Sequence, residues 1–223
     1  MLRAPVVLST SILLAVALCG CGAAPQRPAC ATSATCGSDR LCVTGVCRPK
    51  NEIPTEAAAR RLELVPDRWA VVTSKGSQPW HEADLPLGRA DLGQVCLLMH
   101  FDSPLRESSR VVSAFLVLDP SSGATPGPAP VPLSVSRILE PWNATPSWNR
   151  LPALAEPEAN ALASNWAARP LRIDVTREVV RWKERREDDH GIALVAAPHD
   201  PVGASFSLGL AGGRGPRLEI YLR

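Results

Sequence analysis

The clearest hydrophobic pattern in the chain lies between residues 171 and 195. Apolar residues first alternate with charged ones, as in a half-buried strand, and then recur at the spacing of a helix about two turns long. The alternating positions are Leu171, Ile173 and Val175, and the helical ones are Val175, Val179 and Trp182. After a charged bend, Gly191–Ala196 is apolar again and predicts a second strand.

Short apolar segments separated by turn signals fill most of the remaining chain from Arg60 onward. They are Leu62 with Leu64, Trp69–Val72, Gln94–Phe101, Val111–Leu118, Val131–Val135, Phe206–Leu210 and Leu218–Leu222. Gln94–Phe101 is apolar on both faces, which is typical of a central, covered strand. Two stretches predict loops instead: a polar one through Gly76–Gly88, and Glu140–Ala168, which has little periodicity and many Pro and Ala residues.

About eight short strands in roughly 160 residues, with one short helical turn, predict an all-β fold. We expect an antiparallel, jelly-roll-like β-sandwich over residues 61–223, preceded by a linker at residues 48–60. A segment of that length can bury one continuous core.

The N-terminus has the features of a secretory signal at residues 1–20. A basic start at Arg3 is followed by an apolar run that is too short to span a bilayer as a helix. The run ends in Leu18-Cys19-Gly20-Cys21, which resembles a bacterial lipobox. The resemblance implies that Cys21 is lipidated, and Gly22 in place of a retention aspartate implies the outer membrane. An ordinary signal peptide that leaves Cys21 for a disulfide is the alternative.

Beyond a tether at residues 21–29, the cysteines Cys30, Cys36, Cys42 and Cys47 are separated by five, five and four residues. An exported segment of this size cannot build its own core, so two disulfides are expected within residues 30–47. Of the three possible pairings we favour the interleaved one, Cys30 with Cys42 and Cys36 with Cys47. A zinc site is the alternative, but the paired two-residue spacings of thiolate ligands are missing.

The order of motifs between Arg60 and Arg223 resembles the DNRLRE-domain family of β-sandwich modules in secreted and surface proteins, some of which are grouped with carbohydrate-binding modules. The motifs are Asp67-Arg68-Trp69-Ala70-Val71, Leu97-Leu98-Met99-His100-Phe101-Asp102, Ser113–Leu118, Trp142 with Ser147-Trp148-Asn149 and Pro152, Ile173-Asp174-Val175-Thr176 with Val180 and Trp182, Gly191–Leu194, and Pro216-Arg217-Leu218-Glu219-Ile220. Two positions depart from the family pattern: Met99-His100 replaces the usual arginine before the Phe-Asp pair, and Ser147 replaces threonine. The resemblance implies a sandwich and a surface binding role.

Two of the six tryptophans are candidates for stacking on sugar rings. Trp80 and Trp166 lie in polar loops outside the family pattern, whereas Trp142, Trp148 and Trp182 occupy positions that the pattern makes structural. Filling the core, with the indole N–H bonded to a carbonyl, is the alternative for all of them.

A calcium site at a sheet edge is a second candidate, with Asp102, His100 and possible help from Asp67 as ligands. Nothing in their spacing requires a metal, and no other cofactor is indicated. Cys96 lies alone in a predicted core strand, so we expect a buried thiol, with pairing to another chain as the alternative.

A net charge of +2 gives no case for nucleic acid as a partner. The chain has no Gly-x-Ser-x-Gly elbow, no His-Glu-x-x-His and no phosphate loop. We therefore expect a non-catalytic surface module that reaches the membrane through a lipid anchor and binds polysaccharide. A structural or protein-interaction module without a glycan ligand is one alternative, and a polysaccharide-cleaving enzyme is another.

Overall fold

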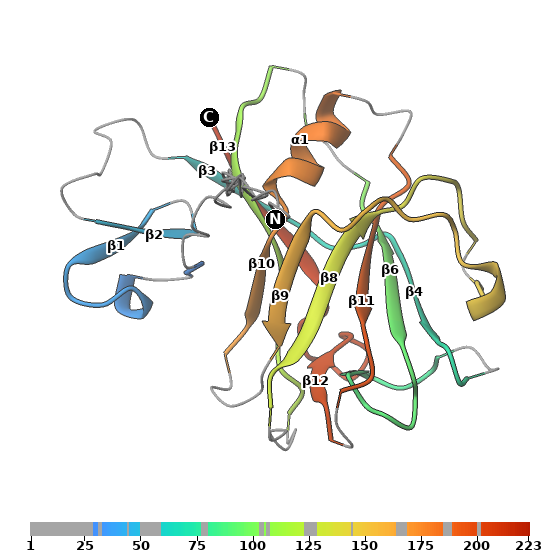
Figure 1. Cartoon of the computed structure of the whole chain (residues 1–223). Coiled ribbons are helices and arrows are strands. Elements are labelled where there is room, and N and C mark those ends of the chain that lie inside the picture. Colours follow the sequence, from blue (N-terminus) through green and yellow to red (C-terminus); the bar gives the residue numbers. More distant parts are fainter. Residues whose placement is uncertain are drawn as a thin grey trace, which may run out of the picture.

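A computed structural model of the protein describes residues 29–30, 33–43, 45–49, 59–76, 80–102, 105, 108–122, 129–143, 145–163, 169–184, 189–199 and 202–223. Two antiparallel sheets face each other and form a β-sandwich, as the hydrophobic pattern predicted (Figure 1). The predicted signal peptide, the predicted lipidation site Cys21 and the candidate Trp166 lie outside these residues. Within them, no helix has the length and apolar character needed to cross a membrane.

The sandwich consists of a four-stranded sheet and a five-stranded sheet. The four-stranded sheet has the order β10 (Leu171–Asp174), β7 (Val111–Leu118), β13 (Arg217–Leu222) and β3 (Arg60–Leu64). The five-stranded sheet has the order β4 (Arg68–Thr73), β6 (Val95–His100), β11 (Ile192–Ala196), β8 (Val131–Arg137) and β9 (Ala159–Ala163). A small pair, β12 (Ala204–Ser207) and β5 (Asp84–Leu87), lies at one end of the sandwich.

One continuous core fills the space between the sheets. Alternate residues of each strand point inward because strand side chains have a period of two. Both sheets contribute fully buried residues, among them Leu97 and Met99 from β6, Leu116 from β7, Leu194 from β11 and Ile220 from β13. Each such side chain contributes roughly 1.5–3 kcal/mol through burial. The sandwich is thus held together mainly by the hydrophobic pattern that predicted it.

The helix α1 (Thr176–Glu184) closes the end of the sandwich opposite β12 and β5 (Figure 1). It follows directly on β10, as the change of period from two to 3.6 predicted. The Asp174 carboxylate accepts a hydrogen bond from the Thr176 N–H at 3.0 Å and so caps the first turn. Val179 and Trp182 are buried in the core, so this corner plugs one end of the two layers.

Two of the predicted loops contain strands. The prediction of a loop through Gly76–Gly88 is wrong at β5, where Leu85 and Leu87 are fully buried and pair with β12. The prediction of a structureless loop over Glu140–Ala168 is also wrong, because β9 pairs with β8 and a short 3₁₀-helix, η3, spans Trp148–Arg150.

The segment before β9 covers the outer face of the five-stranded sheet. Trp142 from this flap packs against Ala70, Cys96 and Leu98 in a second buried cluster, and Trp148 and Leu151 pack on its margin. The Trp142 indole N–H donates to the His190 carbonyl oxygen at 2.8 Å. The Arg68 guanidinium lies over the face of the indole, 4.4 Å from the ring centroid. Trp142 is therefore a structural residue.

The cysteine-rich segment forms a hairpin of β1 (Arg40–Val43) and β2 (Val46–Pro49), preceded by the 3₁₀-turn η1 (Ser33–Thr35). Cys30 pairs with Cys42 and Cys36 with Cys47, which is the interleaved arrangement favoured from the sequence. In Figure 1 this hairpin lies beside the four-stranded sheet, on the side away from the five-stranded sheet.

Candidate functional site

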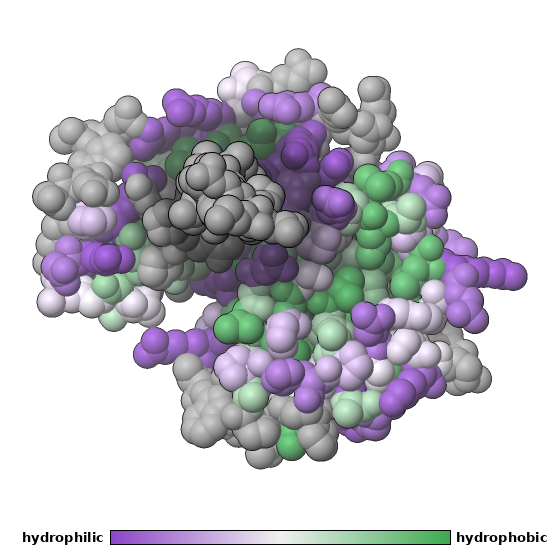
Figure 2. All heavy atoms as spheres, in the orientation of Figure 1, coloured by the Kyte–Doolittle hydropathy of each residue, from purple (hydrophilic) through white to green (hydrophobic). Residues whose placement is uncertain are grey.

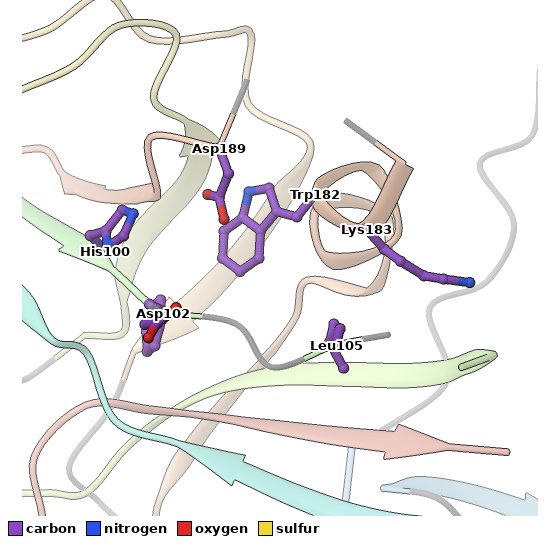
Figure 3. Close-up of a pocket in the computed structure, with 7 residues that line it drawn as sticks. His100, Asp102, Leu105, Trp182, Lys183 and Asp189 are labelled. Carbon is purple, nitrogen blue, oxygen red and sulfur yellow. The ribbon is translucent and has the colours of Figure 1, made fainter. Parts of the chain in front are cut away.

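A pocket of about 250 Å³ opens at the end of the sandwich that α1 closes (Figure 3). The end of β6, the helix and the bend before β11 bring its lining together. The lining residues are His100, Phe101, Asp102, Leu105, Trp182, Lys183 and Asp189. The pocket thus brings charged and polar groups beside two aromatic rings.

His100 and Asp67, two of the predicted metal ligands, are hydrogen-bonded to each other. The His100 Nδ1 lies 2.8 Å from Asp67 Oδ1 and 3.1 Å from Oδ2. Because an ionised carboxylate only accepts hydrogen bonds, Nδ1 carries the hydrogen, and Nε2 of a neutral imidazole is then an acceptor. The contact ties the turn before β4 to the last residue of β6, and it orients the ring at the pocket.

Asp189 is a pocket residue that the sequence pattern did not single out, because it ends a run of charges. Its Oδ1 accepts a hydrogen bond from the Gly191 N–H at 3.1 Å, two residues along the chain. Burial raises the pKa of the Asp189 carboxyl, and the hydrogen bond from Gly191 opposes that shift. The available signal was Asp189-His190-Gly191, since an aspartate two residues before a glycine is typical of an Asx-turn.

The aromatic wall of the pocket comes from Trp182 and Phe101. Their ring centroids are 6.2 Å apart and the planes are tilted by 36°. Both residues are buried, so the wall is fixed by the core on one side and meets the pocket on the other. Trp182 therefore serves the fold and the pocket at once.

Asp102, the third predicted metal ligand, lines the same pocket. The ligand atoms of Asp67, His100 and Asp102 do not all lie within 4.8 Å of one another. In the described part of the chain, the group of three that meets this distance is Cys30, Cys36 and Cys47, whose sulfurs are held in disulfides. Calcium at Asp102, His100 and Asp67 stays a prediction.

Trp80, the candidate for sugar stacking that the structure describes, is half-buried. Its indole N–H donates to the Asp84 carbonyl oxygen at 3.0 Å, and its ring packs against the main core. It lies on the segment that leads into β5, and it does not line the pocket. The structure thus brings two predicted metal ligands to the pocket and leaves Trp80 elsewhere.

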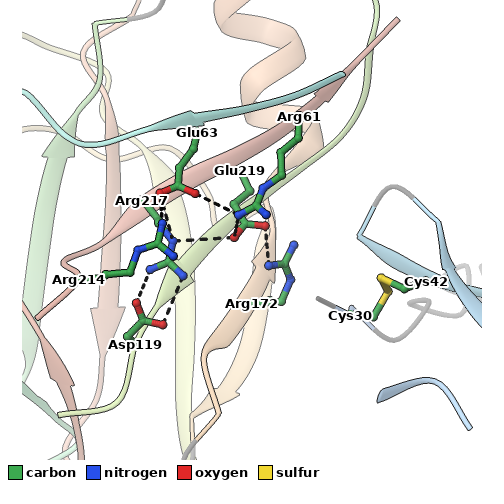
Figure 4. A network of polar contacts seen from close by, with 9 residues as sticks. All are labelled: Cys30, Cys42, Arg61, Glu63, Asp119, Arg172, Arg214, Arg217 and Glu219. Carbon is green, nitrogen blue, oxygen red and sulfur yellow. Dashed lines mark hydrogen bonds and ion pairs between the residues drawn. A yellow bond between two sulfur atoms is a disulfide. The ribbon is translucent and has the colours of Figure 1, made fainter. Parts of the chain in front are cut away.

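A second polar cluster lies on the outer face of the four-stranded sheet (Figure 4). Glu219 on β13 is 3% exposed and accepts hydrogen bonds from Arg61 at 2.7 Å and from Arg172 at 2.6 Å. Arg217, also buried, pairs with Asp119. Each of these buried charges has an opposite charge beside it, so the cluster is a structural ion network.

No protein-family model matches the chain, and no curated protein matches it.

Proposed function

We propose that the protein is a non-catalytic binding module displayed at the bacterial surface, and that its ligand is a polysaccharide. The end pocket is the observation that carries this proposal. Hydroxyl-rich ligands are held by planar polar side chains together with an aromatic ring, and Asp102, Asp189 and Trp182 supply both at one place. Drug-sized ligands use pockets of about 300–1,000 Å³, so this smaller cavity suits a single sugar residue at a chain end or branch.

Retention on immobilised polysaccharides tests this function. The wild-type protein is expected to be retarded on at least one neutral or charged polysaccharide gel, and Asp102→Ala is expected to abolish the retardation. Asp91→Ala is the matched control, because Asp91 lies in an exposed loop before β6, at the end of that strand away from His100. A wild-type protein that no gel retards would refute polysaccharide binding.

Stacking by Trp80 and Trp166 belongs to the same proposal and needs its own variants. Trp80→Phe keeps an aromatic ring against the core but removes the indole N–H, and Trp166→Ala removes the second candidate ring. Weaker retention of either variant, with an unchanged melting temperature, supports a stacking contribution. If both variants are retained like the wild type, neither tryptophan contributes and recognition is limited to the end pocket.

Attachment to the outer membrane through lipidated Cys21 is part of the proposed function and rests on Leu18-Cys19-Gly20-Cys21. Wild-type protein expressed in a Gram-negative host is expected to fractionate with outer membranes and to incorporate labelled fatty acid. Cys21→Ser is expected to lose the label. A labelled Cys21→Ser protein would contradict the assignment of the lipidation site.

Kinship with DNRLRE-domain modules remains a proposal that is supported by the order of motifs and by the strand-to-helix corner at Asp174–Trp182. It agrees with a surface binding role and does not by itself identify a sugar.

A structural or protein-interaction module is the second candidate. It is favoured by exposed apolar side chains such as Leu139 (48%) and Leu162 (64%), and Figure 2 shows apolar residues gathered over the five-stranded sheet on the face displayed. Capture of one specific protein that Leu162→Ser releases, without glycan retention, would favour it. Release of soluble sugars from a glycan would instead favour the third function, a polysaccharide-cleaving enzyme.

A further inference from the structure

We propose that the end pocket recognises a protonated primary amine, as a deacetylated amino sugar carries it. The inference deepens the proposed function and rests on it for the glycan that bears the amine. It follows from the charge, the hydrogen-bonding character and the size of the pocket.

Two carboxylates and one ammonium group line the cavity, so acidic side chains outnumber basic ones there. Asp102 and Asp189 both line it, and in the described part of the chain neither forms an ion pair with a cationic side chain. Figure 3 shows the Asp189 carboxylate directed into the space between Trp182 and Asp102. Lys183 also lines the pocket, but in the described part of the chain it forms no ion pair with Asp102 or Asp189, and Figure 3 shows its side chain extending away from Asp189. A uronate or sulfated sugar would therefore meet two like charges.

The polar groups of the pocket are mainly acceptors. Ionised Asp102 and Asp189 only accept hydrogen bonds, and Nδ1 of His100 is engaged by Asp67. An ammonium group has three donors and no acceptor. It complements this lining more fully than a hydroxyl group, which both donates and accepts, or an acetamido group, which has one N–H.

The aromatic wall of the pocket also favours a cationic ligand. The face of an indole ring attracts cations, and the Trp182 side chain extends from α1 toward Asp189 (Figure 3). Phe101 and Leu105 add apolar surface to the lining beside Trp182. A volume of about 250 Å³ suits one sugar ring or a small free amine.

Isothermal titration of the full mature chain with three probes tests the inference. The probes are a chitosan oligosaccharide, the chitin oligosaccharide of equal length, and a small aliphatic diamine, at a pH that keeps the amines protonated. We expect the deacetylated oligosaccharide to bind at least about tenfold more tightly than the acetylated one, as a charge-assisted hydrogen bond implies.

Two isosteric variants and one control locate the effect. Asp102→Asn and Asp189→Asn are each expected to weaken chitosan binding about tenfold or more. Asparagine keeps an oxygen for the Gly191 N–H, so Asp189→Asn removes charge and preserves the turn. Asp91→Asn changes the net charge equally at a distant exposed site and is expected to bind like the wild type. A thermal melt of each variant excludes loss of folding.

The outcomes separate this inference from the proposed function. Equal binding of chitosan and chitin oligosaccharides overturns the amine preference and leaves polysaccharide binding standing. Binding of the diamine alone upholds the amine site and refutes the glycan function. Chitosan binding that both asparagine variants retain overturns the assignment to this pocket, and no binding of any probe overturns the inference.

Discussion

Gly45 lies directly against the ring of Phe115. A Cβ built on Gly45 would be 2.3 Å from Cε2 of that ring. Gly45 belongs to the turn between β1 and β2, whereas Phe115 lies on the outer face of the four-stranded sheet, since its neighbours Ala114 and Leu116 point into the core. Phe115 is 1% exposed. The disulfide-tied hairpin is therefore docked on the sandwich.

Replacement of Gly45 is expected to undock this hairpin. Gly45→Ala introduces the clash with Phe115 and also places alanine at a φ of +80°, which costs about 1–2 kcal/mol. Gly37→Ala is a matched control, because Gly37 has a φ of +83° but nothing within 4 Å of its built Cβ. Hydrogen exchange should show faster exchange in β1 and β2 for Gly45→Ala than for Gly37→Ala. Equal exchange in both variants would contradict the docking.

The buried ion network on the outer face of the four-stranded sheet gives a second prediction. Glu219→Ala leaves Arg172, whose side chain is 7% exposed, without its carboxylate partner. Removing one partner of a buried pair costs about 3–5 kcal/mol. Urea unfolding should show a loss of that size, whereas Asp91→Ala in the exposed Arg89–Asp91 pair should change the free energy of unfolding far less. Similar losses in the two variants would mean that the Glu219 pair is effectively solvated.

Glu178 on α1 makes stability depend on pH. It is 1% exposed, and burial is the largest cause that raises the pKa of its carboxyl above the usual 4.5. Because the folded state favours the neutral carboxyl, Glu178 contributes most to the free energy of unfolding below pH 4.5. That contribution is lost as the pH rises through the folded-state pKa of the carboxyl. Glu178→Gln should therefore gain stability relative to the wild type between pH 4 and neutrality, on the order of 1 kcal/mol. Melting curves across that range measure it.

Glu184→Gln controls for the loss of one helix charge, because Glu184 is exposed at the end of α1. It should change the melting temperature only slightly. A Glu178→Gln protein that parallels Glu184→Gln would show that burial does not perturb Glu178.

Strands with strong alternation could be predicted from sequence, and strands without it could not. β10 and β11 were predicted because their large apolar residues enter the core at a regular period. β5 was missed because its four residues include Asp84 and Pro86, and its burial depends on the distant partner β12. β9 was missed because its inward residues are alanines, which give a weak hydrophobic signal.

Pro132 shows how tertiary context changes a local rule. Proline in a strand favours an edge, yet β8 lies between β11 and β9. The pairing of β8 with β11 begins at Leu133, so Pro132 lies beyond it and faces Leu162 of β9 alone. The strand therefore tolerates a residue without a backbone N–H at Pro132, because its pairing with β11 has already ended there.

The pocket could be predicted only in part, because some of its residues come from a regular strand and others from a bend without a period. His100 and Asp102 follow a strong core strand, so their place at the end of a sheet could be inferred. Asp189 comes from a charged bend with no period, and only the closure of the sandwich by α1 brings it beside them. The sequence predicted Trp80 as an exposed aromatic residue. Its indole N–H donates a hydrogen bond to the Asp84 carbonyl oxygen and its ring packs on the core, and both contacts depend on β5.

Cys96 provides the last prediction. It is 1% exposed under the Trp142 flap, and burial raises the pKa of its thiol to about 12. Only the thiolate reacts with iodoacetamide, so native protein should stay unlabelled at Cys96 while unfolded protein is labelled. Trp142→Ala should admit the reagent. The neutral thiol contributes fully to the free energy of unfolding below pH 9.0, which is the usual pKa of a cysteine thiol. This contribution should fall as the pH rises toward 12. A Cys96-linked dimer on non-reducing gels would show instead that this strand opens to another chain.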